Sequence, residues 1–454
     1  MKLAAGILAA CGVFLLAGCS GGGSGAAASA SAAADGTPTT TGGASGTQVA
    51  TPNPADAPVV SASNPYGVPF PPTPNPDPFY AKPDPMPDVP PGTILKSRKV
   101  TFKPLAGIPL PNPAWQIQYM SRDVNGKPLP VVETVVKPLL PTLSGKPEVL
   151  SYQLAYDSLG SSCTPSQSLT GNTANADNQE ETLIYLLGHQ LFGWTMVFPD
   201  YEGPYNAYGA GRLAGQATLD GIRAALSFKP LGLTPKTPVA MWGYSGGALA
   251  TAWAATLQPT YAPELNIVGA ASGGTPADTF SVVDSTQNGP FFNLIFSAVV
   301  GTDRAYPELL PQDLLTASGI KTIDSEKDSC TAGGPLFGLS APANFTDYLT
   351  VKDPFATPGA QAIHAAVTLP QTGMSPKIDM YVYHEVLDEI IPIAGTTKMV
   401  DAWCQAGTPV AYDRELGGEH VLGTATGAPG AFLYLVGRFM GQHIVPPTAK
   451  TCNY

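Results

Sequence analysis

The residues of this chain best placed for chemistry lie around Ser245, in the segment VAMWGYSGGALATAWAA at positions 239–255. A short apolar run leads into Gly-Tyr-Ser-Gly-Gly, and an Ala-rich helical pattern follows at once. A serine at such a strand–turn–helix junction can act as a nucleophile, because small neighbours are needed where its hydroxyl is exposed on a strained turn. Gly243 and Gly247 are those neighbours, and the N–H of Gly246 can stabilise a developing oxyanion at the helix N-terminus. The pattern predicts a catalytic Ser245 rather than a non-catalytic glycine-rich turn.

A serine nucleophile needs a general base, and the chain has only five histidines. His420 follows the last predicted strand, in the loop ELGGEHVLG. Catalytic groups of an open α/β sheet gather at the carboxyl ends of its strands, so this position favours His420 as the base. For the other four we expect core or solvated roles; they are His189, His364, His384 and His443.

The acid that orients the base should lie between the serine and the histidine, at the end of the penultimate strand. That stretch reads YVYHEVLDEIIP and offers Glu385, Asp388 and Glu389. Asp388 begins the turn before the apolar IIP, where a short carboxylate can orient an imidazole. We therefore predict a triad in the chain order Ser245, Asp388, His420.

The elements that would position these residues alternate between strand-like and helix-like segments from residue 130 onward, including a helical pattern TLIYLLGHQLF at 182–192. Such alternation predicts an α/β protein with a mostly parallel sheet flanked by helices, and the order Ser, Asp, His along the chain is the order of an α/β-hydrolase fold. The rhythm breaks over 278–375, which we interpret as an inserted cap or lid. The hydrolase domain would then comprise 94–277 and 376–454.

The N-terminus is typical of an exported protein. Residues 1–18 combine one basic residue, a short apolar stretch and a small-residue exit, which predicts a signal peptide. The exit Leu-Ala-Gly-Cys, ending at Cys19, resembles a bacterial lipobox, so we expect lipidation of Cys19 and a membrane anchor; the alternative is an ordinary signal peptide cleaved nearby. Residues 19–93 are Gly/Ala/Ser-rich and then Pro-rich, and we expect a disordered tether with a reach of about 50 Å or more.

Composition excludes some other functions. The chain has 23 Lys and Arg against 34 Asp and Glu, with a net charge of -11 and no basic cluster, so nucleic-acid binding is not expected. Apart from Cys11 in the leader and Cys19 at the predicted anchor, four cysteines remain, and an even number in an exported protein suggests two disulfides with three possible connectivities. The chain contains no C-x-x-C pair, so the cysteines do not indicate a zinc site. A metal or organic cofactor is not required by the predicted chemistry. The four cysteines expected to form disulfides are Cys163, Cys330, Cys404 and Cys452.

Several segments together resemble the secretory lipase family of α/β-hydrolases, over roughly residues 95 to 453. The most specific are FPDYEGP, LDGIRAA, WGYSGGALATAWAA and the loops that carry Asp388 and His420. The resemblance implies that Ser245 is the nucleophile, Asp388 the acid and His420 the base.

The resemblance also implies details that the residues alone leave open. It implies that Asp157, in the AYDS turn after the run EVLSYQLAY, provides the second oxyanion-hole group beside Gly246; a helix N-cap or turn role is the alternative for Asp157. It implies the pairing Cys163–Cys330 and Cys404–Cys452. For Asp200 and Glu202 of FPDYEGP we expect buried hydrogen-bonding roles.

These observations predict a membrane-anchored serine ester hydrolase of exported type, a lipase that acts on triacylglycerols or related lipid esters through an acyl-enzyme. Two alternatives remain open. One is a carboxylesterase or acyltransferase for small soluble esters, and the other is a non-catalytic surface binding protein on a hydrolase scaffold. The presence of all three triad members favours an enzyme.

Overall fold

The computed structural model describes residues 58–454 apart from 105–106, 173–180, 182–187, 308–311 and 331–342. All described residues belong to one compact unit, Ala55–Tyr454. The predicted signal peptide, Cys19, the Gly/Ala/Ser-rich segment and most of the helix predicted over 182–192 lie outside the described residues.

A single sheet of ten strands forms the centre of this unit, in the order β1-β2-β3-β5-β4-β6-β7-β8-β9-β10. The strands from β5 through β9 in that order run parallel, whereas β1, β2 and β3 at one edge and β10 at the other pair antiparallel. This arrangement confirms the predicted α/β class with a mostly parallel sheet. The strands are β1 (Ile94–Thr101), β2 (Pro113–Arg122), β3 (Pro128–Val136), β4 (Val149–Gln153), β5 (Thr195–Pro199), β6 (Val239–Tyr244), β7 (Ile267–Gly273), β8 (Met380–Glu385), β9 (Val410–Glu415) and β10 (Lys450–Cys452).

The central strands of the sheet are buried on both faces because helices cover them. Every residue of β4, β5, β6 and β8 is buried, as expected for parallel strands with helices on either side. Helices α5 and α6 pack against each other, and a Cβ at Gly215 of α5 would approach the backbone of α6 at Ala254, so small residues allow this close contact. The helices of this layer structure are α2 (Pro165–Ser168), α5 (Gly211–Ser227), α6 (Gly246–Tyr261), α11 (Ile393–Gln405), α12 (His420–Thr426) and α13 (Ala428–Phe439), with the short 3₁₀ helices η2 (Pro78–Tyr80) and η3 (Lys229–Leu231).

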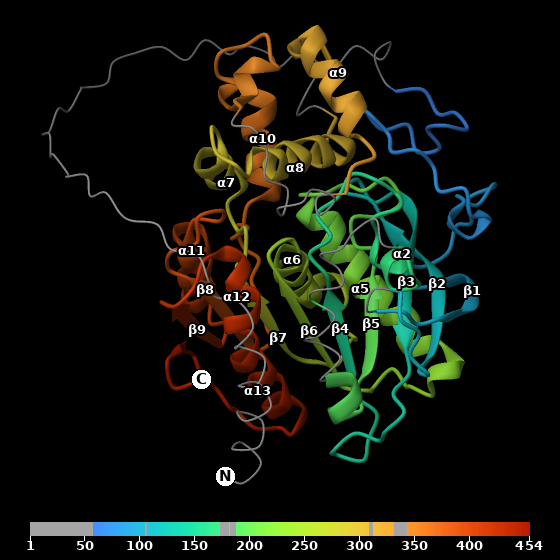
Figure 1. Cartoon of the computed structure of the whole chain (residues 1–454). Helices are drawn as coiled ribbons and strands as arrows, with labels where there is room; N and C mark the ends of the chain where they lie inside the picture. The colour runs from blue at the N-terminus through green and yellow to red at the C-terminus, as the bar shows by residue number, and fades with distance from the viewer. Residues whose placement is uncertain (1–57, 105–106, 173–180, 182–187, 308–311, 331–342) are drawn as a thin grey trace, which may run out of the picture. The chain divides into compact units, whose positions relative to one another are not determined.

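The chain between β7 and β8 is helical and has its own apolar core. Figure 1 shows α7 to α10 grouped beyond one end of the sheet. The Leu369 N–H donates to the Ala277 carbonyl, so the two ends of this insertion lie side by side. Leu159, Ile390 and Ile391, which belong to the sheet domain, are part of the same apolar core. The elements are α7 (Thr279–Thr286), α8 (Phe292–Ala305), η4 (Gln312–Leu314), α9 (Ala317–Glu326), η6 (Phe345–Asp347), η7 (Pro354–Ala356) and α10 (Pro358–Val367).

The disordered tether predicted over 19–93 is wrong for residues 58–93, which we call the strap. Val68 and Phe79 of the strap are buried, with 7% and 9% exposure. Carbonyl groups of the strap accept hydrogen bonds from domain side chains, including Phe70 O from Arg304 Nε at 3.0 Å. The high proline content removes N–H donors from the strap but leaves its carbonyls and apolar side chains able to pack. The strap therefore forms an ordered layer on the domain.

Candidate active site

Ser245 occupies a sharp turn between β6 and α6. Its backbone has φ 53° and ψ −123°, a conformation that is strained for a residue with a side chain. A Cβ at Gly243 would collide with the carbonyl oxygen of Gly247, and a Cβ at Gly247 would collide with the carbonyl oxygen of Gln153. Both glycines are thus required by the close approach of backbone segments at this turn.

The structure brings Ser245, His420 and Asp388 into one hydrogen-bonded chain. Ser245 Oγ lies 2.8 Å from His420 Nε2, and His420 Nδ1 lies 2.7 Å from Asp388 Oδ2. All three side chains are buried, with Ser245 8% and His420 5% exposed as residues. This arrangement is competent for general-base activation of the serine hydroxyl.

His420 was expected in a loop, but it is the first residue of α12. The preceding Glu419 caps this helix, and its carboxylate accepts hydrogen bonds from the N–H groups of Val421 and Leu422. The His420 N–H donates to Glu389 Oε2 at 3.0 Å, and the His420 carbonyl accepts from Tyr244 OH at 2.6 Å. The backbone of the histidine is therefore fixed on both sides, which orients its ring toward Ser245.

Asp388 is held as a carboxylate by four donors. Its Oδ1 accepts from the N–H groups of Ile390 and Ile391 at 3.0 and 2.6 Å, and its Oδ2 faces two imidazoles. Burial alone would raise the pKa of Asp388, but hydrogen bonds from His384 and His420 hold it well below the usual range. Asp388 is consequently ionised throughout the neutral range.

His384 is the part of this site that the sequence did not indicate. Its Nε2 lies 3.1 Å from Asp388 Oδ2 and 2.9 Å from the Ile391 carbonyl, and its side chain is fully buried. Nε2 donates to both acceptors, so Asp388 contacts two histidines, His384 and His420. The motif H-x-x-x-D brings them together only because the turn after β8 folds Asp388 back onto the end of the strand.

Asp157 lies directly opposite Gly246. A Cβ at Gly246 would collide with Asp157 Oδ1, and Asp157 itself has φ 36°, in the left-handed region. The residue caps no described helix, since Thr164 precedes α2. A helix N-cap role is therefore excluded for Asp157 within the described residues, which leaves a turn role and the oxyanion-hole role as its alternatives.

The other histidines lie away from Ser245. His189 is buried between Asn112 Nδ2 and the Trp194 carbonyl, each at 2.8 Å, and burial lowers its pKa. His364 pairs with Asp278 at 2.8 Å. His443 is largely exposed.

Asp200 and Glu202, the two acids of FPDYEGP, are both buried. Asp200 accepts hydrogen bonds from the N–H and hydroxyl of Ser166 at 2.9 and 2.6 Å, and burial raises its pKa to about 7. Burial likewise raises the pKa of Glu202 well above its ordinary value. Both acids are buried, as expected.

Two disulfides join cysteines in the described part of the chain, and they confirm the predicted pairing. Cys163 and Cys330 have Cα atoms 5.5 Å apart, and Cys404 and Cys452 have Cα atoms 5.8 Å apart. The second bridge joins α11 to β10, which pairs with β9, the strand that leads toward His420. Among the described residues, no cluster of three histidine, cysteine or acidic side chains could hold a metal ion. No helix in the described part of the chain is long and apolar enough to cross a membrane.

Comparison with known proteins finds similarity to a family of lipases. Residues 168–446 match the profile of the family described as Secretory lipase. Lipase 4 of Candida albicans is 34% identical over 385 residues, covering 81% of this chain and 82% of that protein. A secreted triacylglycerol lipase of Malassezia furfur is 32% identical over 381 residues, covering 81% of this chain and 76% of that protein.

Solved structures give the same result. Candida antarctica lipase A, in its closed state, superimposes with a TM-score of 0.73 at 29% identity, covering 82% of this chain and 87% of that chain. A rice cell wall degrading esterase of Xanthomonas oryzae, at 17% identity and a TM-score of 0.57 with 75% of this chain and 95% of that chain covered, shares the fold. The chain therefore belongs to the secretory lipase family.

Proposed function

We propose that this protein hydrolyses carboxylic esters of lipids through a Ser245–His420–Asp388 triad and an acyl-enzyme. The observation that carries this proposal is the continuous chain of contacts at 2.8 and 2.7 Å that ends on a serine in a strained turn. A serine that was only structural would need neither the unfavourable φ nor a buried base–acid pair beside it.

In the acylation step, Ser245 Oγ attacks the ester carbonyl carbon while His420 Nε2 accepts the hydroxyl proton. The Nδ1–H of His420 stays hydrogen-bonded to Asp388, whose carboxylate stabilises the imidazolium that forms. The carbonyl oxygen becomes an oxyanion, for which the N–H groups of Gly246 and Asp157 are the proposed donors. The protonated His420 then gives its proton to the leaving alkoxide, and the alcohol departs.

In the deacylation step, His420 Nε2 removes a proton from water, and the resulting nucleophile attacks the acyl carbon on Ser245. Collapse of the second tetrahedral intermediate breaks the bond to Ser245 Oγ, which regains a proton from His420. The products are a carboxylic acid and the free enzyme.

The surroundings of the triad favour a lipid substrate. The apolar core of the α7–α10 insertion includes Ile390 and Ile391, which directly follow the catalytic acid loop. Leu387, Leu416 and Leu422 lie on the loops and helix that carry Asp388 and His420, and they are 71%, 79% and 41% exposed. Exposed large apolar side chains beside a catalytic site are suited to contact a lipid–water interface.

The ester panel that tests this function runs from p-nitrophenyl acetate to p-nitrophenyl palmitate, with Ser245→Ala as the blank. We expect hydrolysis to extend to long acyl chains and to fall to background in the variant. Activity confined to the shortest esters would instead identify a carboxylesterase. Products formed in the presence of an added alcohol separate hydrolysis from acyl transfer.

We propose further that the mature chain is attached to a membrane through lipidated Cys19. The support is the sequence Leu-Ala-Gly-Cys at the end of an apolar leader. In a bacterial host fed radiolabelled palmitate, the wild-type protein should take up label and sediment with membranes. A Cys19→Ser variant should lose both properties, and an unlabelled, freely released wild type would contradict the anchor.

A further inference from the structure

Arg304, in the last turn of α8, is a buried guanidinium that the proposed chemistry does not use. The residue is 2% exposed, and no described carboxylate lies within salt-bridge distance of it. Burial lowers its pKa to about 9, which still leaves the side chain charged at neutral pH. A buried charge is costly unless hydrogen bonds compensate it, so its acceptors indicate what it is for.

Among the described residues, the acceptors of the guanidinium are all backbone carbonyls. Nη1 donates to Leu159 O at 2.7 Å, to Tyr205 O at 2.9 Å and to Asn206 O at 3.1 Å. Nε donates to Phe70 O at 3.0 Å, and Nη2 donates to Lys327 O at 2.8 Å. These acceptors belong to four segments that are remote in the sequence: the strap, the loop after β4, the loop after β5 and the end of α9.

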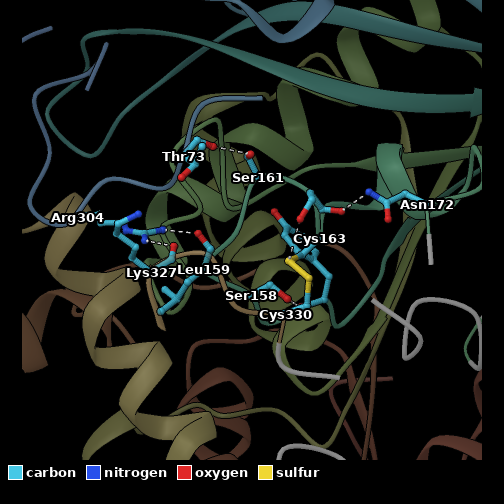
Figure 2. The surroundings of a disulfide bond; sticks show 11 residues. Thr73, Ser158, Leu159, Ser161, Cys163, Asn172, Arg304, Lys327 and Cys330 are labelled. Atoms are coloured by element: carbon cyan, nitrogen blue, oxygen red, sulfur yellow. Dashed lines mark hydrogen bonds between the residues drawn. A yellow bond between two sulfur atoms is a disulfide. The ribbon is translucent and has the colours of Figure 1, made fainter. Parts of the chain in front are cut away.

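The loop after β4 is the segment that matters for the proposed catalysis, because it contains Asp157. We call residues 156–163 the oxyanion loop. The N–H groups of Leu159 and Gly160 both donate to Ser329 O, at 3.0 and 3.2 Å, and the Cys163–Cys330 bridge joins the loop to the same part of the insertion. Figure 2 shows the hydrogen bonds from Arg304 to Leu159 and Lys327, with this disulfide nearby.

The strap is attached at the same place. Thr73 donates from its N–H to Asp328 Oδ1 at 2.6 Å and from its hydroxyl to Asp328 Oδ2 at 2.7 Å. Ser161 of the oxyanion loop donates to Thr73 O at 2.7 Å, as Figure 2 shows. The strap, the oxyanion loop and the end of α9 therefore meet around Arg304.

Asp157 needs such support because its φ of 36° is unfavourable for a residue with a side chain. A strained backbone conformation persists only where the surrounding contacts determine it. Leu159, two residues further on, is fixed through both its carbonyl, by Arg304, and its N–H, by Ser329. The direction of the Asp157 N–H depends on this short stretch of backbone.

We propose that Arg304 is a positioning residue for ester hydrolysis, which holds the oxyanion loop so that the Asp157 N–H points at the developing oxyanion. This inference rests on the proposed function. It assigns a role to a residue of the insertion that touches neither the substrate nor the triad. It also means that this end of the insertion is fixed to the catalytic domain.

The test compares Arg304→Met and Arg304→Lys with wild type on p-nitrophenyl butyrate. Methionine fills much of the volume but donates no hydrogen bond, whereas lysine keeps the charge and three donors without the planar fork. We expect kcat to fall about 10- to 100-fold in Arg304→Met with KM within about three-fold, because an oxyanion donor acts on the transition state. Arg304→Lys should lie between Arg304→Met and wild type.

Two further readouts separate positioning from a loss of folding. The affinity for an aryl trifluoromethyl ketone, which forms a hemiketal oxyanion on the serine, should fall in parallel with kcat/KM. Near-UV circular dichroism should show the variants folded at the assay temperature. Arg223→Met is the matched control, since Arg223 also binds a carbonyl and two carboxylates but lies on α5; it should keep kcat within about two-fold.

The outcomes distinguish this inference from the proposed function. A wild-type protein that is inactive and does not bind the ketone would refute the proposed function itself. An active wild type with unchanged kcat in folded Arg304→Met would overturn the role of Arg304 alone. If Arg304→Met does not fold, Arg304→Lys decides: a lower kcat with retained KM supports the inference, and a kcat equal to wild type overturns it.

Discussion

The contact between Gly246 and Asp157 allows a sharp test of the oxyanion geometry. Gly246 has an ordinary helical backbone as the first residue of α6, so alanine is compatible with its dihedral angles. The added methyl group, however, would occupy the position of Asp157 Oδ1, with Asp157 Cγ only 2.7 Å away. Asp157 is buried and has little room to move. We predict that Gly246→Ala folds but displaces the two proposed oxyanion donors relative to each other.

The size of the effect follows from this overlap. Forcing one methyl group into a packed site costs about 1–3 kcal/mol, and each 1.36 kcal/mol in a barrier is a factor of about ten. Overlap alone would thus reduce the rate about 5- to 150-fold. Complete loss of one oxyanion donor costs about 100- to 1000-fold in kcat. We expect kcat/KM of Gly246→Ala to fall about 100-fold.

A second substitution should restore much of this loss. Asp157→Gly removes the colliding carboxylate, keeps the backbone N–H and suits the positive φ of this position, so alone it should cost less than about ten-fold. The Gly246→Ala/Asp157→Gly double variant should recover at least about ten-fold over Gly246→Ala, which corresponds to a coupling of at least about 1.4 kcal/mol. Gly247→Ala is the matched control, because its methyl group would meet the Gln153 backbone carbonyl, which Asp157→Gly does not remove.

The assay is the kcat/KM of each variant on p-nitrophenyl butyrate, with folding checked by thermal melting. A double variant no more active than Gly246→Ala would refute the reasoning, because the collision with Asp157 would then not be the cause of the loss. Rescue of Gly247→Ala by Asp157→Gly would refute it as well, since that collision is with another residue.

Three further predictions concern other parts of the site and fold. His384→Phe removes one of the four donors to Asp388, and a hydrogen bond to a charged group is worth about 1.5–3 kcal/mol. Thermal melting should therefore show lower stability, while kcat at pH 8 should fall less than about ten-fold. A loss of kcat near the roughly 10⁴-fold expected for Asp388→Asn would show that His384 acts in the reaction. Burial and the neighbouring Glu385 raise the pKa of Glu415 to about 8 from an ordinary 4.5. Its protonated form therefore stabilises the fold fully below pH 4.5, and this stabilisation is lost as the pH rises through 8. The Tm of Glu415→Gln relative to wild type should increase from pH 5 to pH 9, and a constant difference in Tm would contradict this. Serine in place of both Cys404 and Cys452, which are 48 residues apart, should lower the free energy of unfolding in urea by about 2–4 kcal/mol while kcat at 25 °C is retained; an unchanged unfolding midpoint would contradict this.

The parts of the site that could be predicted from the sequence have local signals. The run before Ser245, its small neighbours and the helix after it are contiguous, and the turn they predict is the one the structure has. The parallel sheet also follows from local patterns, since buried strands are read as continuous apolar runs. The disulfide pairing was accessible only through the family resemblance, because four cysteines allow three connectivities.

The parts that were missed depend on contacts between remote segments. Arg304 binds carbonyls near residues 70, 159, 205 and 327, and a backbone acceptor leaves no mark in the sequence. The strap was misread because proline content describes the isolated segment, whereas its order comes from surfaces that the folded domain provides. His384 could be recognised as a partner of Asp388 only once the turn after β8 was known.

The central claim is that Ser245 forms an acyl-enzyme, and trapping that species tests it most directly. The protein would be mixed with excess p-nitrophenyl butyrate, quenched in acid within the first turnovers, and examined by intact and peptide mass spectrometry. The account predicts a butyryl adduct on the peptide that contains Ser245, absent from Ser245→Ala, which should also lose turnover. An adduct on another residue, or hydrolysis that survives in Ser245→Ala, would contradict it.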